Sequence, residues 1–136
     1  MKKNQIHFLL VSVFLVTIVA CKKQYATGDT VYLADRKVRL QLWTTEDFSN
    51  DNSVINFSAF IKSERKTLFD SSLASMRVKD IPDSLHRIIV EKTIRADINS
   101  VLSAGFNVEM PGIGITWHLD TVQAGNTFKT INYSFK

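Results

Sequence analysis

The sequence predicts an all-β fold, an antiparallel β-sandwich of about six or seven short strands. Two observations support this prediction. Beyond residue 30, most segments alternate apolar and polar residues, which is the period of a strand with one buried face. Turn-forming pairs such as Pro111-Gly112 and Gly125-Asn126 separate these segments.

The first strands are expected in residues 38–43 (VRLQLW) and 55–61 (INFSAFI), where apolar residues recur at every second position. A charged turn at 64–66 then leads to a short return strand at Leu68-Phe69. Another short element is expected in residues 76–81. It ends at Pro82, because proline has no N–H to contribute to a strand ladder.

The segment Leu85–Ile94 (LHRIIVEKTI) fits two structures. Its apolar spacing suits a helix capped by Asp83 or Ser84. The β-branched run from Ile88 to Val90 suits a pleated sheet better, so we favour a strand. Residues 95–100 are then expected to form a loop or a single helical turn.

The last three strands are expected in residues 102–110, 113–119 and 131–135. Within residues 113–119 the isoleucines, Trp117 and Leu119 occupy every second position. This phase predicts that Trp117 belongs to the core.

In size and strand rhythm, residues 31–136 resemble an immunoglobulin-like or fibronectin-type sandwich. The inter-sheet cysteine pair of a true immunoglobulin domain is missing, because Cys21 is the only cysteine. The strand topology therefore stays open, and alternation alone also fits an up-and-down barrel.

Residues 1–20 are expected to form a helical signal peptide. Lys2 and Lys3 precede the apolar run 8–20 (FLLVSVFLVTIVA), in the order typical of a secretory signal. The run is shorter than the about 20 apolar residues that a membrane-spanning helix needs. Its removal leaves 136 − 20 = 116 residues, a length that usually forms one domain.

The cleavage site carries a family resemblance. Residues 18–21 (IVAC) resemble the lipobox of bacterial lipoproteins. The resemblance implies cleavage before Cys21, a diacylglycerol on its sulfur and an acyl chain, such as palmitate, on the new amino group. Two or more acyl chains hold a protein on a membrane essentially permanently. Residues 21–30 would be a short tether to a single domain at 31–136.

The same resemblance implies a location. In some lineages an aspartate after the lipidated cysteine retains the protein in the inner membrane, and here the residue is Lys22. We therefore expect the outer membrane, facing the periplasm or the cell exterior. The expected partners are the membrane, through the lipid on Cys21, and an envelope protein whose identity the sequence does not give.

The charge balance argues against nucleic acid as a partner. The chain has 17 basic and 13 acidic residues, and loss of Lys2 and Lys3 leaves 17 − 2 = 15 basic ones, a net charge of +2. Apart from Lys22 and Lys23, the basic residues are scattered along the chain, unlike the basic patches that bind nucleic acid.

Catalytic and metal-binding patterns are weak in this sequence. His118 and Asp120 share one face of a strand, and His86 could join them as a metal ligand, but solvated side chains explain this spacing as well. Glu46 and Asp47 are adjacent carboxylates, a pattern more typical of a turn cap than of a glycosidase. We expect no cofactor and no enzymatic activity.

Three aromatic residues fall out of phase with the core pattern. Trp43 and Phe60 lie on the polar faces of their strands, and Phe48 lies in a polar loop. If they converge, they form a candidate interaction surface; the alternative is that a second layer covers them. The expected function is a non-enzymatic binding, assembly or accessory module of the envelope. A structural or adhesive surface subunit is the alternative, followed by a small envelope enzyme or metal-binding protein.

Overall fold

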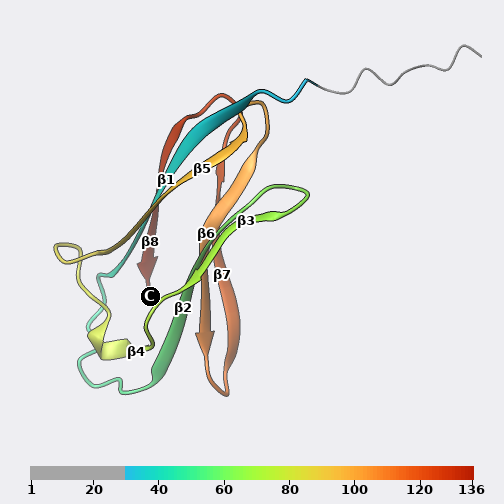
Figure 1. Ribbon diagram of the computed structural model, residues 1–136. Helices are drawn as coiled ribbons and strands as arrows, with labels where there is room; N and C mark the ends of the chain where they lie inside the picture. Colours follow the sequence, from blue (N-terminus) through green and yellow to red (C-terminus); the bar gives the residue numbers. More distant parts are fainter. Residues whose placement is uncertain (1–29) are drawn as a thin grey trace, which may run out of the picture. The chain divides into compact units, whose positions relative to one another are not determined.

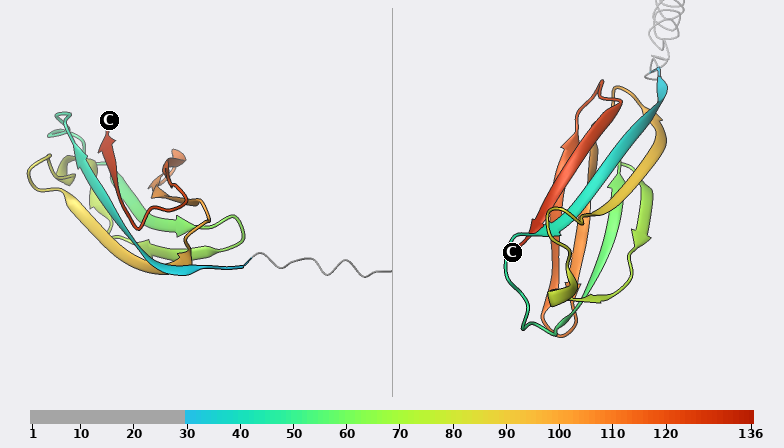
Figure 2. Two further views of the ribbon diagram at one scale, coloured as in Figure 1. Left: turned by 90° about the horizontal axis from the view of Figure 1, so that it is seen from above. Right: turned by 90° about the vertical axis from the view of Figure 1, so that its left-hand side faces the viewer.

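A computed structural model describes residues 30–136. The predicted signal peptide, Cys21 and nearly all of the tether therefore lie outside the described residues. The compact unit Val31–Lys136 consists of strands in two facing sheets, which Figure 1 and Figure 2 show as two layers. The all-β prediction is confirmed, with eight strands in this unit rather than six or seven.

The smaller sheet has three strands in the order β5-β1-β8. They are β1 (Leu33–Thr44), β5 (Ile88–Asp97) and β8 (Phe128–Phe135). β5 pairs antiparallel with β1, whereas β8 pairs parallel with it. The prediction of a wholly antiparallel sandwich is therefore wrong at this pair. Between β5 and β8 the chain forms β6 and β7 in the other sheet, so β8 is not joined to β1 by a hairpin. It returns on the other side of β1 and runs in the same direction.

The larger sheet has five strands, four of them in the order β3-β2-β6-β7. They are β2 (Val54–Lys62), β3 (Thr67–Ser72), β6 (Leu102–Met110) and β7 (Gly114–Val122). The two-residue β4 (Met76–Arg77) also pairs with β2, and the 3-10 turn η1 (Val78–Asp80) follows it. All pairs in this sheet are antiparallel, and β7 forms one of its edges.

Residues 88–94 of the segment Leu85–Ile94 form a strand, which confirms the favoured interpretation for that part. β5 begins at Ile88 and continues to Asp97, so the expected loop at 95–100 is wrong for its first three residues. The extension follows from pairing, because β1 offers ten successive partners from Leu42 back to Leu33. Apolar side chains from both sheets fill the space between them. They include Val38, Leu40, Leu42, Ile55, Phe57, Ile61, Leu102, Phe106, Val108 and Ile131.

One charged residue belongs to this interior. Arg36 is fully buried and in phase with the core residues of β1. Its guanidinium donates hydrogen bonds of 2.7–3.3 Å to five backbone carbonyls, those of Asp97, Ser100, Val122, Gln123 and Asn126. Arg36 thus ties the β5–β6 turn to the β7–β8 turn at one end of the sandwich. Burial lowers the pKa of the guanidinium, and the nearby charge of Asp97 opposes this shift.

A candidate binding face on the larger sheet

The most unusual surface feature is a line of exposed apolar side chains at β7. The exposed fractions are 78% for Ile113, 61% for Ile115, 69% for Trp117 and 56% for Leu119. We call these four residues the apolar stripe. The prediction that Trp117 belongs to the core is therefore wrong, and the strand presents to solvent the face that its phase assigned to the interior.

The register with β6 explains this reversal. Trp117 lies opposite Asn107, and directly opposed residues of an antiparallel pair share a face. Asn107 points outward, because its neighbours Phe106 and Val108 occupy the core. Trp117 must follow Asn107 to the outside.

The polar residues of β7 consequently face the edge of the smaller sheet. The ring of His118 stacks on that of Tyr133 at 4.6 Å between centroids, and Asp120 forms an ion pair of 3.1 Å with Lys129. The pKa of Asp120 is lowered, first by the N–H of Thr121 and then by Lys129. Burial raises the pKa of Tyr133. These contacts join β7 to β8.

A shallow groove of about 480 Å³ lies beside the stripe on the outward face of the larger sheet. Ile115 and Trp117 line it on the β7 side, and Leu73 and Ser75 line it on the other, where the chain leaves β3. Ligand sites in proteins span about 300–1,000 Å³, so the groove has room for a small ligand. Its lining also includes Asn56, Ser58, Ser72, Asn107 and Glu109.

The floor of the groove is polar and partly pre-arranged. Ser75 donates a 2.6 Å hydrogen bond to Asn56, whose amide donates to Glu109 at 3.4 Å. The amide of Asn107 donates to the hydroxyl of Ser58 at 3.2 Å. The Oδ1 atom of Asn107 is buried and has no hydrogen-bond partner within residues 30–136. Such unsatisfied buried atoms are few in native proteins.

The structure does not bring Trp43, Phe48 and Phe60 together, so the predicted shared surface is wrong. Trp43 lies on the smaller sheet, with the guanidinium of Arg87 4.5 Å from its ring centre. Phe48 packs edge-on against Phe135 at 5.5 Å. Phe60, on the larger sheet, is only 2% exposed. The alternative of covered aromatics describes Phe60, and it describes Phe48 in part.

The two histidines considered as metal ligands lie in separate surroundings. His86 contacts Asp83 at 2.9 Å in the exposed loop before β5, whereas His118 stacks on Tyr133. Within the described part of the chain, no three His, Cys, Asp or Glu side chains are placed to share a metal ion. No helix in residues 30–136 has the length and apolar character to cross a membrane.

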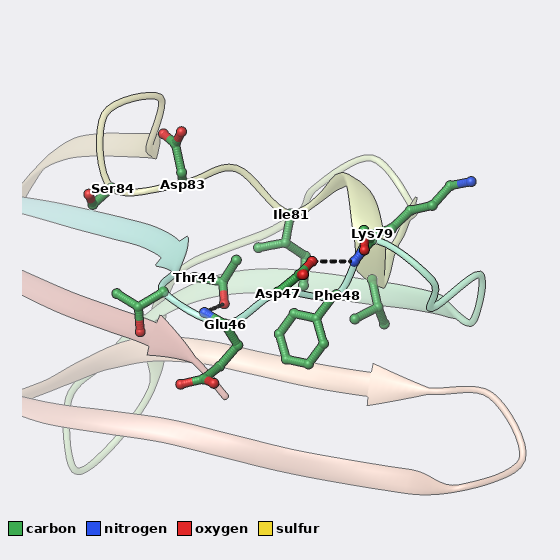
Figure 3. A pocket seen from close by; sticks show the side chains of 11 residues that line it. Thr44, Glu46, Asp47, Phe48, Lys79, Ile81, Asp83 and Ser84 are labelled. Atoms are coloured by element: carbon green, nitrogen blue, oxygen red, sulfur yellow. Dashed lines mark hydrogen bonds between the residues drawn. The ribbon is translucent and has the colours of Figure 1, made fainter.

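A second hollow, of about 450 Å³, lies at the end of β1 (Figure 3) and contains Glu46 and Asp47. Asp47 accepts a hydrogen bond from the N–H of Ser49, which lowers its pKa and holds the turn. Figure 3 shows Phe48 inside the hollow and the Lys79 amine extending away from both carboxylates. The turn-cap interpretation of this acidic pair therefore fits Asp47.

Comparisons with protein-family models, with curated proteins and with solved structures found no match to this chain. The candidate face consequently depends on geometry alone. The sequence alone could have indicated it only through the apolar period of β7, which also fits a core strand.

Proposed function

We propose that this chain is a lipid-anchored, non-enzymatic binding module of the bacterial outer membrane that binds through the apolar stripe and the adjoining groove. The anchor is the lipid expected on Cys21, supported by the lipobox resemblance of residues 18–21. The observation that carries the proposal is the stripe, since four large apolar side chains, each more than half exposed, form one line along an edge strand and the turn before it. Contiguous exposed apolar surface typically marks a site of interaction.

The energy available at the stripe is large enough for recognition. Covering about 150 Å² of exposed tryptophan at about 25 cal/mol per Å² stabilises a complex by about 4 kcal/mol before the costs of association. Trp117 is the most favourable anchor, because tryptophans dominate the energetics of many interfaces.

The groove lies away from the point where the chain enters the domain. The chain enters the domain at the start of β1, and the β6–β7 turn lies at the opposite end of the domain (Figure 1). The groove lies nearer that turn, because Asn56 pairs with Glu109, one residue from the end of β6. A ligand in the groove therefore lies toward the end of the domain opposite the start of β1.

A structural or adhesive subunit is the second candidate. It is favoured by the position of β7, which has a strand neighbour on one side only. An edge strand can accept a partner strand through its free backbone groups. A partner strand there would lie beside the stripe.

The experiment uses photo-crosslinking residues in the full chain expressed in its envelope. We expect a crosslinker at Ile115 to capture a specific envelope component. The matched control is Phe128, which is 49% exposed on β8 of the other sheet. Equal capture at both positions, or none at Ile115, would contradict the proposed binding face.

A separate measurement tests the anchor. Cells grown with labelled palmitate should yield a labelled protein, and Cys21→Ser should remove the label. An unlabelled wild-type protein would contradict the membrane address without bearing on the binding face.

A further inference from the structure

We propose that the groove beside Trp117 binds a neutral saccharide, with one sugar ring stacked on the indole and its hydroxyls bonded to the polar floor. This inference rests on the proposed binding function and names the chemical class of its ligand. It assigns a role to the polar half of the groove, which an apolar stripe alone would not require.

The first step concerns the indole. A sugar ring has C–H groups on its faces and hydroxyls around its rim, so it combines a flat apolar surface with a polar edge. Trp117 is 69% exposed and lines the groove together with Ile115. An exposed aromatic ring gains most from a flat apolar partner that covers its face while leaving polar groups free at the side.

The second step concerns the floor. Asn56, Asn107 and Ser58 can each donate and accept hydrogen bonds, and Glu109 accepts them. Hydroxyl groups also donate and accept, so a saccharide can satisfy such a mixed floor in full. A ligand with acceptors alone would leave the Oδ1 atom of Asn107 without a donor. A ligand with donors alone would offer the two amides no acceptor beyond Glu109 and Ser58, to which they already donate.

The unpartnered oxygen of Asn107 strengthens this step. Its amide already donates to Ser58, while Oδ1 has no partner among the described residues. A buried polar atom without a partner costs about 1–3 kcal/mol. A small rotation of the side chain toward a ligand hydroxyl would supply that partner, because Asn107 is part of the groove wall.

The third step concerns charge. Glu109 is the only charged side chain among the groove residues, and none of them is basic. An isolated carboxylate repels phosphates and acidic sugars, so the ligand is not an anion, and a neutral saccharide meets this condition. The polar floor also disfavours a lipid tail, because hydrocarbon would remove these polar groups from water and offer them no hydrogen bond in return.

The fourth step separates a saccharide from a peptide strand. The floor lies on the face of the sheet, where the backbones of β2 and β6 are already paired with each other. A peptide strand draws its affinity from free backbone groups at an edge. Recognition on this face must come from side chains, as it does for a small hydroxyl-rich ring.

The test titrates the full lipidated chain, held in a detergent without a sugar headgroup, with four neutral hexasaccharides: cellohexaose, chitohexaose, maltohexaose and mannohexaose. Binding is followed by calorimetry and by tryptophan fluorescence. We expect at least one of the four to bind, Trp117→Ala to weaken binding at least about 30-fold and Trp117→Tyr to weaken it less. Asn107→Ala should weaken it about 10-fold.

The matched controls are Ile89→Ala, which removes another apolar side chain that is more than half exposed, from β5, and Trp43→Phe, which changes the other tryptophan. Both should leave affinity unchanged and melting temperatures close to wild type. Failure of all four sugars to bind, or binding that survives Trp117→Ala, would overturn the saccharide site. If no sugar binds but a crosslinker at Ile115 still captures an envelope component, the proposed binding face stands and only the saccharide site is wrong. If no sugar binds and nothing is captured at Ile115, both proposals are wrong.

Discussion

Arg36 offers the most demanding test of how this domain is held together. Its side chain is fully buried, and its five hydrogen bonds reach backbone carbonyls of two separate turns. We consider the replacement Arg36→Met, which keeps most of the apolar stem and removes every donor. The contacts between the β5–β6 and β7–β8 turns then lose their common partner.

The expected loss of stability follows from opposing terms. Each hydrogen bond from a charged group to a carbonyl contributes about 1.5–3 kcal/mol, but methionine also removes the several kcal/mol needed to bury the guanidinium. Four of the five bonds are only partly buried, so water can replace the donor there, whereas the carbonyl of Val122 is fully buried. A net loss of about 3 kcal/mol is expected.

Arg36→Lys separates charge from geometry. Lysine keeps the positive charge but has at most three N–H donors, so at least two of the five carbonyls stay without a donor. We expect a loss of about 2 kcal/mol, smaller than for methionine. Arg39→Met is the matched control, because Arg39 makes a partly exposed ion pair of 2.7 Å with Glu91 that is worth at most about 1 kcal/mol.

The measurement is thermal and urea unfolding of the full chain in detergent, followed by circular dichroism. For a domain of this size about 3 kcal/mol corresponds to a fall in Tm of about 12 °C. Equal melting temperatures for Arg36→Met and Arg39→Met would refute the reasoning. A methionine variant more stable than wild type would show that the cost of burying the guanidinium exceeds its five bonds.

Three further predictions concern the two sheets. Gly105→Ala should destabilise by about 1–3 kcal/mol in urea unfolding, because a Cβ there would overlap the backbone carbonyl of His118; Ser103→Ala on the same face should be nearly neutral. Glu91→Gln should lower the urea midpoint at pH 7, and its difference from wild type should vanish in acid. Hydrogen bonds from Lys37 and then Arg39 lower the pKa of Glu91 in the folded state. The contribution of Glu91 to stability is therefore complete above its unfolded pKa of about 4.3 and is lost as pH falls through the folded pKa. A stability difference between Glu91→Gln and wild type that stays constant down to pH 2 would contradict this. His118→Ala should cost about 1 kcal/mol through the lost stack on Tyr133, and unchanged stability would show that the β7–β8 seam does not depend on it.

The sequence predicts the strands of this protein well, because alternation reports directly which residues share a face. It also contains a sign of the buried arginine, since Arg36 is in phase with Val38 and Leu40. A charged residue is nevertheless expected at the surface, because a guanidinium can be buried only where carbonyls accept its hydrogen bonds. Here those carbonyls belong to turns about 60 to 90 residues away in sequence. No local pattern encodes those partners.

The prediction that Trp117 belongs to the core is wrong for a related reason. Period two defines two faces of β7, but only its pairing decides which of them meets the core. The register with β6 places His118 beside Phe106 and Trp117 beside Asn107. Pairing registers depend on turns and neighbours, so apolar character alone misplaced Trp117.

The outward stripe is maintained against the hydrophobic effect, and the β6–β7 hairpin explains how. A slip of one residue would move the whole apolar set of β7 to the inner face. The turn resists such a slip, because Gly112 and Gly114 adopt positive φ angles of 80° and 146° and Ile113 donates a 3.0 Å hydrogen bond to Met110. A slip would also take Asp120 away from Lys129. The fold thus specifies exposure of Trp117 through backbone geometry and an ion pair, and the exposed indole remains available to a ligand beside the polar groove.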